Sequence, residues 1–156
     1  ARPDTFMPRN WNPGLSSWHY EKDYKSNWGW TGNKATNVRS KSINFPVNVS
    51  CKHHTVMIQA LHSHVYDFGE VACSIGSDHR NETKISDGKN HQREEVFHIN
   101  TKWHDRTTQL DTSIIKPTRW EHPDCLDSSK SEVIVAAILT CTVISGKVIL
   151  RGITSC

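Results

Sequence analysis

Short runs of alternating apolar and polar residues are the feature that most limits what this chain can fold into. Ser42–Ser50 alternates four apolar side chains with polar ones, and Glu95–Trp103 repeats the pattern. A period of two places alternate side chains on one face of a β-strand. Further strand-like runs are Thr55–Tyr66, Gly69–Ile75 and Gln109–Ile115, with turn residues between them. No amphipathic helix is evident, so the sequence predicts an all-β fold, most simply an antiparallel β-sandwich.

The C-terminal end is the most apolar part of the chain. Residues 131–145, SEVIVAAILTCTVIS, are apolar on both faces and rich in β-branched side chains. This pattern indicates either a strand buried on both faces or a buried helix. The turn residues at 145–147, followed by Val148–Leu150, favour a β-hairpin and therefore the strand. The uncharged stretch Val133–Gly146 is shorter than the roughly 20 residues of a spanning helix, so we expect no membrane span.

The first 38 residues differ from the rest of the chain. They hold four of the six tryptophans and no cysteine, and they sustain neither the helical nor the strand period. We therefore expect residues 1–38 to form an irregular Trp-rich arm that packs its aromatic rings onto a β-sandwich domain of residues 39–156. The tryptophans are Trp11, Trp18, Trp28 and Trp30.

Five cysteines occur, at positions 51, 73, 125, 141 and 156. No two form a CxxC pair, which argues against a zinc site made of cysteines alone. Two intramolecular disulfides would leave one cysteine unpaired. Any of the five cysteines can be the unpaired one, and the other four can pair in three ways, so the sequence allows fifteen schemes. Cys51 and Cys156 are the best candidates for the unpaired thiol. An interchain bridge through either would make a homo-oligomer, and a buried free thiol is the alternative.

The glycosylation sequons and the charge of the chain bear on the compartment of the protein and on its partners. Asn48 and Asn81 begin Asn-X-Ser/Thr sequons, which together with the cysteines predict a secreted, extracellular glycoprotein. The chain carries 19 Lys and Arg against 16 Asp and Glu, scattered without a basic run. This mixed charge argues against nucleic acid as a partner.

Ten histidines make metal binding the next question. His62 and His64 would point the same way in a strand and could together hold Zn²⁺ or Cu²⁺ with a third ligand. Solvent-facing histidines that bind nothing specific are the simpler alternative, so we expect no obligatory cofactor.

Residues suited to sugar binding follow the alternating run that ends at Trp103. A tryptophan offers a flat apolar face, and the next residues, His104 and Asp105, offer directional hydrogen bonds. A sugar ring presents the complementary mixture of an apolar C–H face and hydroxyl groups. A core tryptophan with solvated neighbours is the alternative. The chain has no Gly-X-Ser-X-Gly elbow, glycine-rich phosphate loop or HExxH motif, so we do not expect an enzyme.

Two segments resemble H-type lectins. EVFHINTKWHDRTTQ, residues 95–109, resembles that family's strand-and-loop motif, and residues 42–61 look like its paired strands, with Trp120 in the place of its closing tryptophan. The resemblance covers at most Trp30–Trp120. It implies a six-stranded antiparallel sandwich that forms oligomers and binds galactose or N-acetylgalactosamine without catalysis. It also places Trp103 and His104 in the sugar pocket.

The sequence thus supports two functions. The first is a secreted protein that binds glycans of the galactose or N-acetylgalactosamine type. The second is a secreted factor for host interaction, defence or cytokine-like signalling that binds a cell-surface protein. In that alternative the Trp-rich segment would supply the anchor residues, because tryptophan is favoured in binding hot spots.

Overall fold

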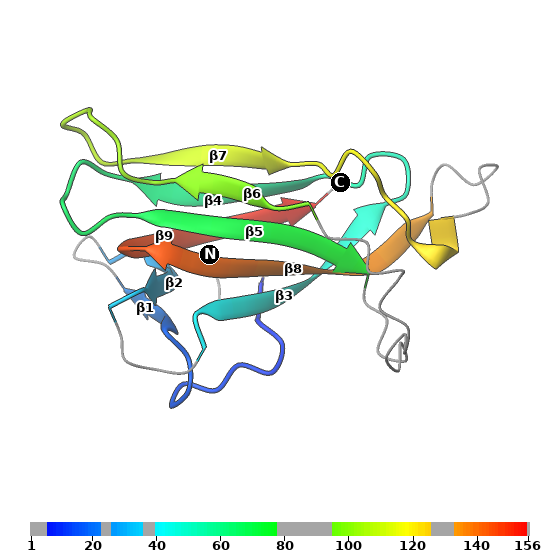
Figure 1. Cartoon of the computed structure of the whole chain (residues 1–156), viewed down its shortest axis with the longest axis horizontal. Coiled ribbons are helices and arrows are strands. Elements are labelled where there is room, and N and C mark those ends of the chain that lie inside the picture. Colours follow the sequence, from blue (N-terminus) through cyan, green and yellow to red (C-terminus); the bar gives the residue numbers. More distant parts are fainter. Residues whose placement is uncertain (1–5, 23–25, 36–39, 78–94, 126–132, 156) are drawn as a thin grey trace.

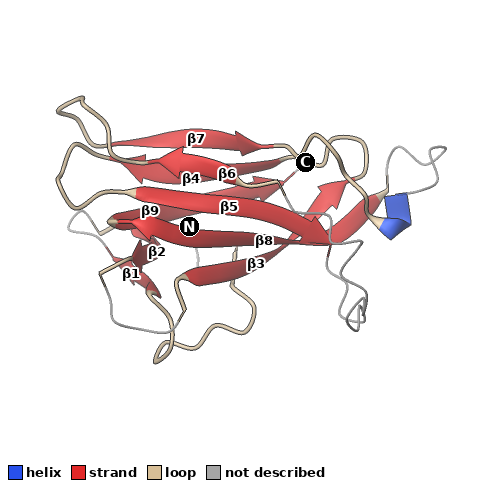
Figure 2. Cartoon of the chain, viewed as in Figure 1, coloured by secondary structure: helices blue, strands red, loops and turns tan. Residues whose placement is uncertain are grey.

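Two antiparallel β-sheets make up the described part of the chain. The computed structural model describes residues 6–22, 26–35, 40–77, 95–125 and 133–155, and within them nine strands stack in two layers (Figure 1). The predicted antiparallel β-sandwich is confirmed. One short 3-10 turn, η2 (Pro123–Cys125), interrupts the strands and loops (Figure 2). None of the described residues forms a helix long and apolar enough to cross a membrane.

The strand order shows which segments are neighbours. The five-stranded sheet has the order β1 (Trp18–Lys22), β2 (Trp28–Asn33), β9 (Lys147–Ser155), β4 (Val56–His62), β7 (Gln109–Ile115). The four-stranded sheet has the order β3 (Ser42–Ser50), β8 (Ile134–Ser145), β5 (Glu70–Ser77), β6 (Phe97–Asn100). Each strand predicted from Ser42 onward is therefore present, although β4 ends four residues before Tyr66.

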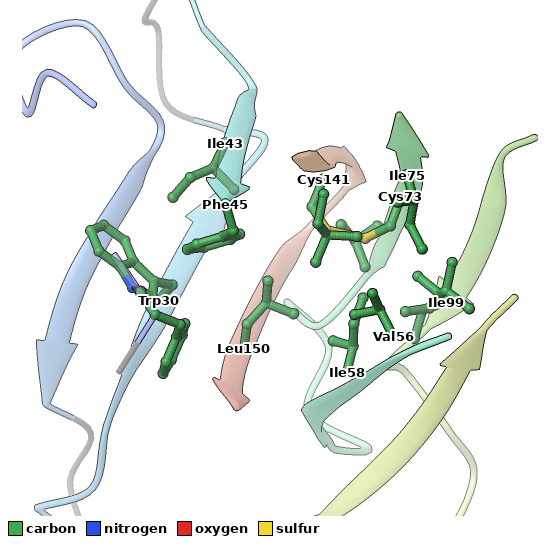
Figure 3. Packing of buried hydrophobic residues seen from close by; sticks show 14 of the residues in the cluster. Trp30, Ile43, Phe45, Val56, Ile58, Cys73, Ile75, Ile99, Cys141 and Leu150 are labelled. Atoms are coloured by element: carbon green, nitrogen blue, oxygen red, sulfur yellow. Dashed lines mark hydrogen bonds between the residues drawn. A yellow bond between two sulfur atoms is a disulfide. The ribbon is translucent and has the colours of Figure 1, made fainter. Parts of the chain in front are cut away.

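Apolar alternation decides which face of each strand is buried. In β3, Ile43, Phe45 and Val49 are buried, whereas Asn44 and Asn48 are exposed. The same alternation fills the space between the sheets with interlocking side chains from both layers (Figure 3). This contiguous interior is the hydrophobic core of the sandwich.

The strand β8 is buried on one face only. Val135, Leu139 and Val143 point into the core, whereas Ile134 and Ile144 are 68% and 42% exposed. The expectation of two buried faces is wrong, because no described segment forms a third layer over the outer face of the four-stranded sheet.

The described residues of the N-terminal segment are not irregular. β1 and β2 form a hairpin, and β2 pairs with β9, so both strands extend the five-stranded sheet. Trp18 and Trp30 are almost completely buried in the core. Their indole N–H groups donate to the backbone oxygens of Lys41 and Phe6, at 2.9 and 3.3 Å. The prediction of an irregular arm is therefore wrong for this hairpin.

Two glycines explain why the sequence does not show a strand pattern in this hairpin. Gly29 and Gly32 occupy positions inside β2, where glycine normally indicates a turn. A Cβ at Gly32 would lie 2.6 Å from the Trp18 ring, so the glycine makes room for the buried indole. The local composition therefore resembles a loop although the tertiary packing requires a strand.

Both disulfides involve cysteines of the core or its border. Cys73 and Cys141 are bonded to each other and stand directly opposite in the β5–β8 pair. Cys51, after β3, is bonded to Cys125 in η2. The prediction of an unpaired Cys51 is wrong, because the loop after β7 carries Cys125 back to the end of β3. Cys156 lies outside the described residues and stays a prediction.

Candidate functional site

A cavity of about 360 Å³ lies over one end of the five-stranded sheet. It faces away from the core, since Leu61, Ile149 and Thr31 lie between core-facing neighbours on their strands. Its volume falls in the range of small-molecule sites. The lining residues come from β1, β2, β4, β9 and three loops; they are Glu21, Lys22, Asn27, Thr31, Leu61, Ser63, Val65, Asp67, Phe68, Thr108, Lys147 and Ile149.

Close backbone packing shapes one wall of this cavity. The loop after β4 lies directly against the β8–β9 turn: Lys147 N–H donates to the Asp67 carbonyl at 2.6 Å, and Gly69 N–H donates to the Lys147 carbonyl at 2.9 Å. A Cβ at Gly69 would collide with the Ser145 carbonyl. Gly146 has a φ of 60°, which favours glycine. Both glycines therefore bring the loop and the turn within hydrogen-bonding reach.

This packing sets up an ion pair at the cavity wall. Lys147 Nζ lies 2.9 Å from Asp67 Oδ2 and 5.0 Å from the centre of the Phe68 ring. Both side chains are partly exposed, at 27% for Lys147 and 38% for Asp67. The ammonium group is a donor and the carboxylate an acceptor, so the pair presents both kinds of hydrogen-bonding group to one ligand.

A second polar pair lies where β4 ends and β7 begins. Ser63 Oγ and Thr108 Oγ1 are hydrogen-bonded at 2.9 Å, and both residues line the cavity. The Ser63 N–H donates to the Thr101 carbonyl at 2.9 Å, and Ser63 is buried. The hydroxyl pair is therefore held in place by the backbone of the segment that leads to Trp103.

The residues predicted to bind sugar lie beside this cavity rather than in its lining. Trp103 is half-buried, and its indole N–H donates to the Thr107 carbonyl at 2.8 Å, inside its own loop. His104 and Asp105 follow it and are exposed. Thr108, at the end of the same loop, reaches the cavity. The contribution of Trp103, His104 and Asp105 to ligand binding stays a prediction.

The two histidines predicted to share a face do not do so. His62 ends β4 and is buried, with its ring centre 5.3 Å from that of Trp103, whereas His64 lies beyond the strand and is exposed. The shared-face prediction is wrong because the strand stops before His64. Among the residues that the structure describes, no three His, Cys, Asp or Glu side chains are grouped to hold a metal ion.

His62 has an unusual environment. Its Nε2 is buried without a hydrogen-bond partner among the described residues, and Asp111 Oδ2 lies 4.0 Å away. Burial lowers the pKa of His62 below its ordinary value, and the Asp111 carboxylate partly opposes that effect. His62 therefore favours the neutral form, packed against Trp103.

The remaining predicted sites are only partly described. Asn48 is exposed on the outer face of edge strand β3, which leaves room for a glycan, whereas Asn81 lies outside the described residues. Of the four N-terminal tryptophans, only Trp28 is exposed, at 43%. Trp18 and Trp30 cannot serve as anchors for a protein partner, because the core already contains them.

Sequence reasoning missed the residues that line the cavity. Asp67 and Lys147 belong to no motif, and they meet only because the loop after β4 packs on the β8–β9 turn. The glycines at 69 and 146 are the single local signal, since a glycine at a strand end indicates a close backbone approach.

Comparison with known proteins does not assign this chain to a family. No protein-family profile matches the sequence, and no curated protein is detectably similar to it. Among solved structures, the chain is similar to the carbohydrate-binding module TmCBM61 in complex with β-1,4-galactotriose, at 13% identity and a TM-score of 0.33. That likeness covers 90% of this chain and 88% of the other.

Proposed function

We propose that this protein binds carbohydrate in the cavity over the five-stranded sheet. The observation that carries the proposal is the pairing of an apolar floor, Leu61 and Ile149, with the Asp67–Lys147 pair at the wall. A sugar ring needs an apolar surface for its C–H face and fixed donors and acceptors for its hydroxyl groups. The cavity offers these together.

The charges around the cavity favour a neutral sugar. Lys147 is balanced by Asp67 at 2.9 Å, and the remaining charged lining residues are one acid, Glu21, and one base, Lys22. An anionic sugar would meet no excess of positive charge, so its carboxylate would lose hydration without compensation. Galactose and N-acetylgalactosamine, which the sequence resemblance suggests, are neutral and suit this balance.

The loop that holds Trp103, His104 and Asp105 supplies a flank of the proposed site. It ends at Thr108, whose hydroxyl group pairs with Ser63 at the cavity. We propose that these three side chains contact either a glycan that extends beyond the cavity or a glycan bound by an oligomer of the protein, because they lie next to the cavity. The protein acts in this proposal as a non-catalytic binding module.

We also propose that the protein is secreted. The two disulfides among the described residues suit an oxidising compartment, and the exposed Asn48 in a sequon suits glycosylation there. Treating the natively secreted protein with peptide N-glycosidase should lower its apparent mass. An unchanged mass would contradict glycosylation at Asn48 and Asn81.

A glycan array followed by calorimetric titration tests the sugar proposal. We expect galactose-type glycans to bind, and Lys147→Met to weaken binding by about 10- to 100-fold, because one charge-assisted hydrogen bond contributes about 1.5–3 kcal/mol. Lys116→Met is the matched control, since Lys116 is exposed and does not line the cavity. A silent array, or equal loss with both variants, would overturn the proposal and favour a protein partner.

A further inference from the structure

Strand β7 forms one edge of the five-stranded sheet, and no described segment pairs with its outer side (Figure 1). It pairs with β4 over all seven of its residues without a register shift. Leu110 and Ile114 are 48% and 65% exposed, and Gln109, Asp111 and Thr112 are exposed as well. Such an edge leaves the N–H and C=O groups of alternate residues available for pairing with another strand.

The other three sheet edges are each protected in a way that β7 is not. β3 contains Pro46, which lacks a backbone donor, and the sequon at Asn48. β6 is only four residues long, and β1 has five residues and ends in the charged pair Glu21 and Lys22. Proline, short length and charge are the usual means by which native sheets prevent edge pairing. β7 has seven residues and neither proline nor lysine, so it is the edge best suited to accept another strand.

The side chains of β7 are self-complementary about Thr112. When a second copy of β7 runs antiparallel with Thr112 opposite Thr112, Leu110 faces Ile114 of the other copy, and this contact occurs twice. Both side chains lie on the outer face of the sheet, away from the core. On the inner face, Asp111 then stands opposite the hydroxyl group of Ser113 rather than a second carboxylate. A two-fold axis requires this kind of self-complementarity, so the pattern favours a second copy of the chain as the partner.

We infer that two copies of this chain pair antiparallel through β7, so that their five-stranded sheets form one continuous sheet with a two-fold axis at Thr112. The pairing satisfies the backbone groups of the edge and covers Leu110 and Ile114. Leu61, which stands opposite Leu110 in the sheet, lines the cavity, so the two cavities open on the same side of the joined sheet. A consequence that rests on the proposed function is that both cavities bind one glycan-covered surface at once, which raises avidity.

The molecular mass in solution tests the pairing without any sugar. The full chain carries Cys156→Ser, so that no interchain disulfide can produce a dimer, and is measured by sedimentation from about 1 to 100 μM, where an interface of modest size dissociates. We expect a reversible equilibrium between monomer and dimer. Thr112→Lys should weaken the dimer more than about tenfold, because two ammonium groups then face each other at the axis. Thr112→Glu should do the same, and an equal mixture of the two variants should form a heterodimer, which shows that both are folded.

Thr154→Lys is the matched control and should leave the dimer unchanged, since Thr154 is an exposed threonine of β9, inside the same sheet. The mass of a single chain at every concentration would overturn the inference. A dimer that Thr112→Lys does not weaken, or that the mixture does not restore, would overturn it too.

A sensor surface coated with N-acetylgalactosamine tests the consequence for avidity. The dimer should dissociate from this surface more slowly than the Thr112→Lys protein. Equal dissociation would overturn simultaneous binding by both cavities. A protein that dimerises but does not bind the surface would count against the proposed function and leave the β7 pairing intact.

Discussion

The interior between the two sheets and the cavity on the outside of the five-stranded sheet are stabilised in different ways. The interior is apolar and filled by alternate residues of adjacent strands, with Cys73–Cys141 bonded inside it. The cavity wall depends on backbone hydrogen bonds between the loop after β4 and the β8–β9 turn, and on the ion pair between Asp67 and Lys147. We therefore expect interior substitutions to reduce stability, and cavity substitutions to change binding more than stability.

Trp30→Ala should produce the largest effect. The side chain is 1% exposed and its indole packs on Phe45 and Trp11, so truncation removes buried area and leaves a cavity. We expect a loss of about 3–5 kcal/mol in the free energy of unfolding, measured by chemical denaturation. Trp28→Ala, two residues away on the same strand, should cost much less. Equal losses would contradict the division between interior and exposed rings.

Gly69→Ala should have the next largest effect, because Gly69 lies where the loop after β4 packs on the β8–β9 turn, between the interior and the cavity. The added Cβ would collide with the backbone carbonyl of Ser145, which cannot move without disturbing the hairpin. We expect a loss of about 1–3 kcal/mol together with weaker ligand binding. Gly14→Ala is the control, since its nearest neighbour would lie at an ordinary 3.5 Å. A Gly69→Ala protein as stable as the control would show that the loop does not need this close approach.

The same two regions differ in how far the sequence predicts them. Strands such as β3 follow from alternation, because the apolar face must be buried whatever its partner is. The hairpin containing Trp30 could not be recognised because of its glycines, of which Gly32 makes room for Trp18 and Gly29 lies close to the backbone of β9. One-sided burial of β8 could not be predicted either, since its outer isoleucines look like core residues until the layers are known.

Long-range pairing limits prediction of the site even more. Cys73 and Cys141 are opposite each other only after β5 and β8 are placed side by side. Asp67 and Lys147 likewise meet through a loop and a turn that share no local pattern. Trp103 was singled out because a tryptophan followed by His104 and Asp105 suggested sugar chemistry, whereas the cavity lining combines ordinary residues from four strands and three loops.

Asp67→Asn should separate binding from stability. It removes the ionic part of the contact with Lys147 while keeping the side-chain shape. Because both side chains are partly exposed, we expect a stability change below about 1 kcal/mol. We expect a larger change in the free energy of sugar binding than in the free energy of unfolding. The Lys147 ammonium group then lacks its carboxylate partner and is no longer held in the same orientation. A large loss of stability with unchanged sugar affinity would show that this part of the cavity wall stabilises the fold, as the interior does, and does not contribute to binding.

A smaller, pH-dependent effect should come from His62, which lies at the border between the interior and the Trp103 loop. Burial lowers the pKa of His62 in the folded protein below the ordinary value of 6.5. The unfolded chain therefore takes up the proton first as the pH falls below about 6.5, and folding stability falls with it. His62→Gln should flatten this part of the stability profile in denaturation measured between pH 5 and 8, as the imidazole range suggests. His64→Gln, at an exposed position two residues on, should leave the slope unchanged. Equal slopes in the parent protein and His62→Gln would mean that the buried imidazole does not couple protonation to folding.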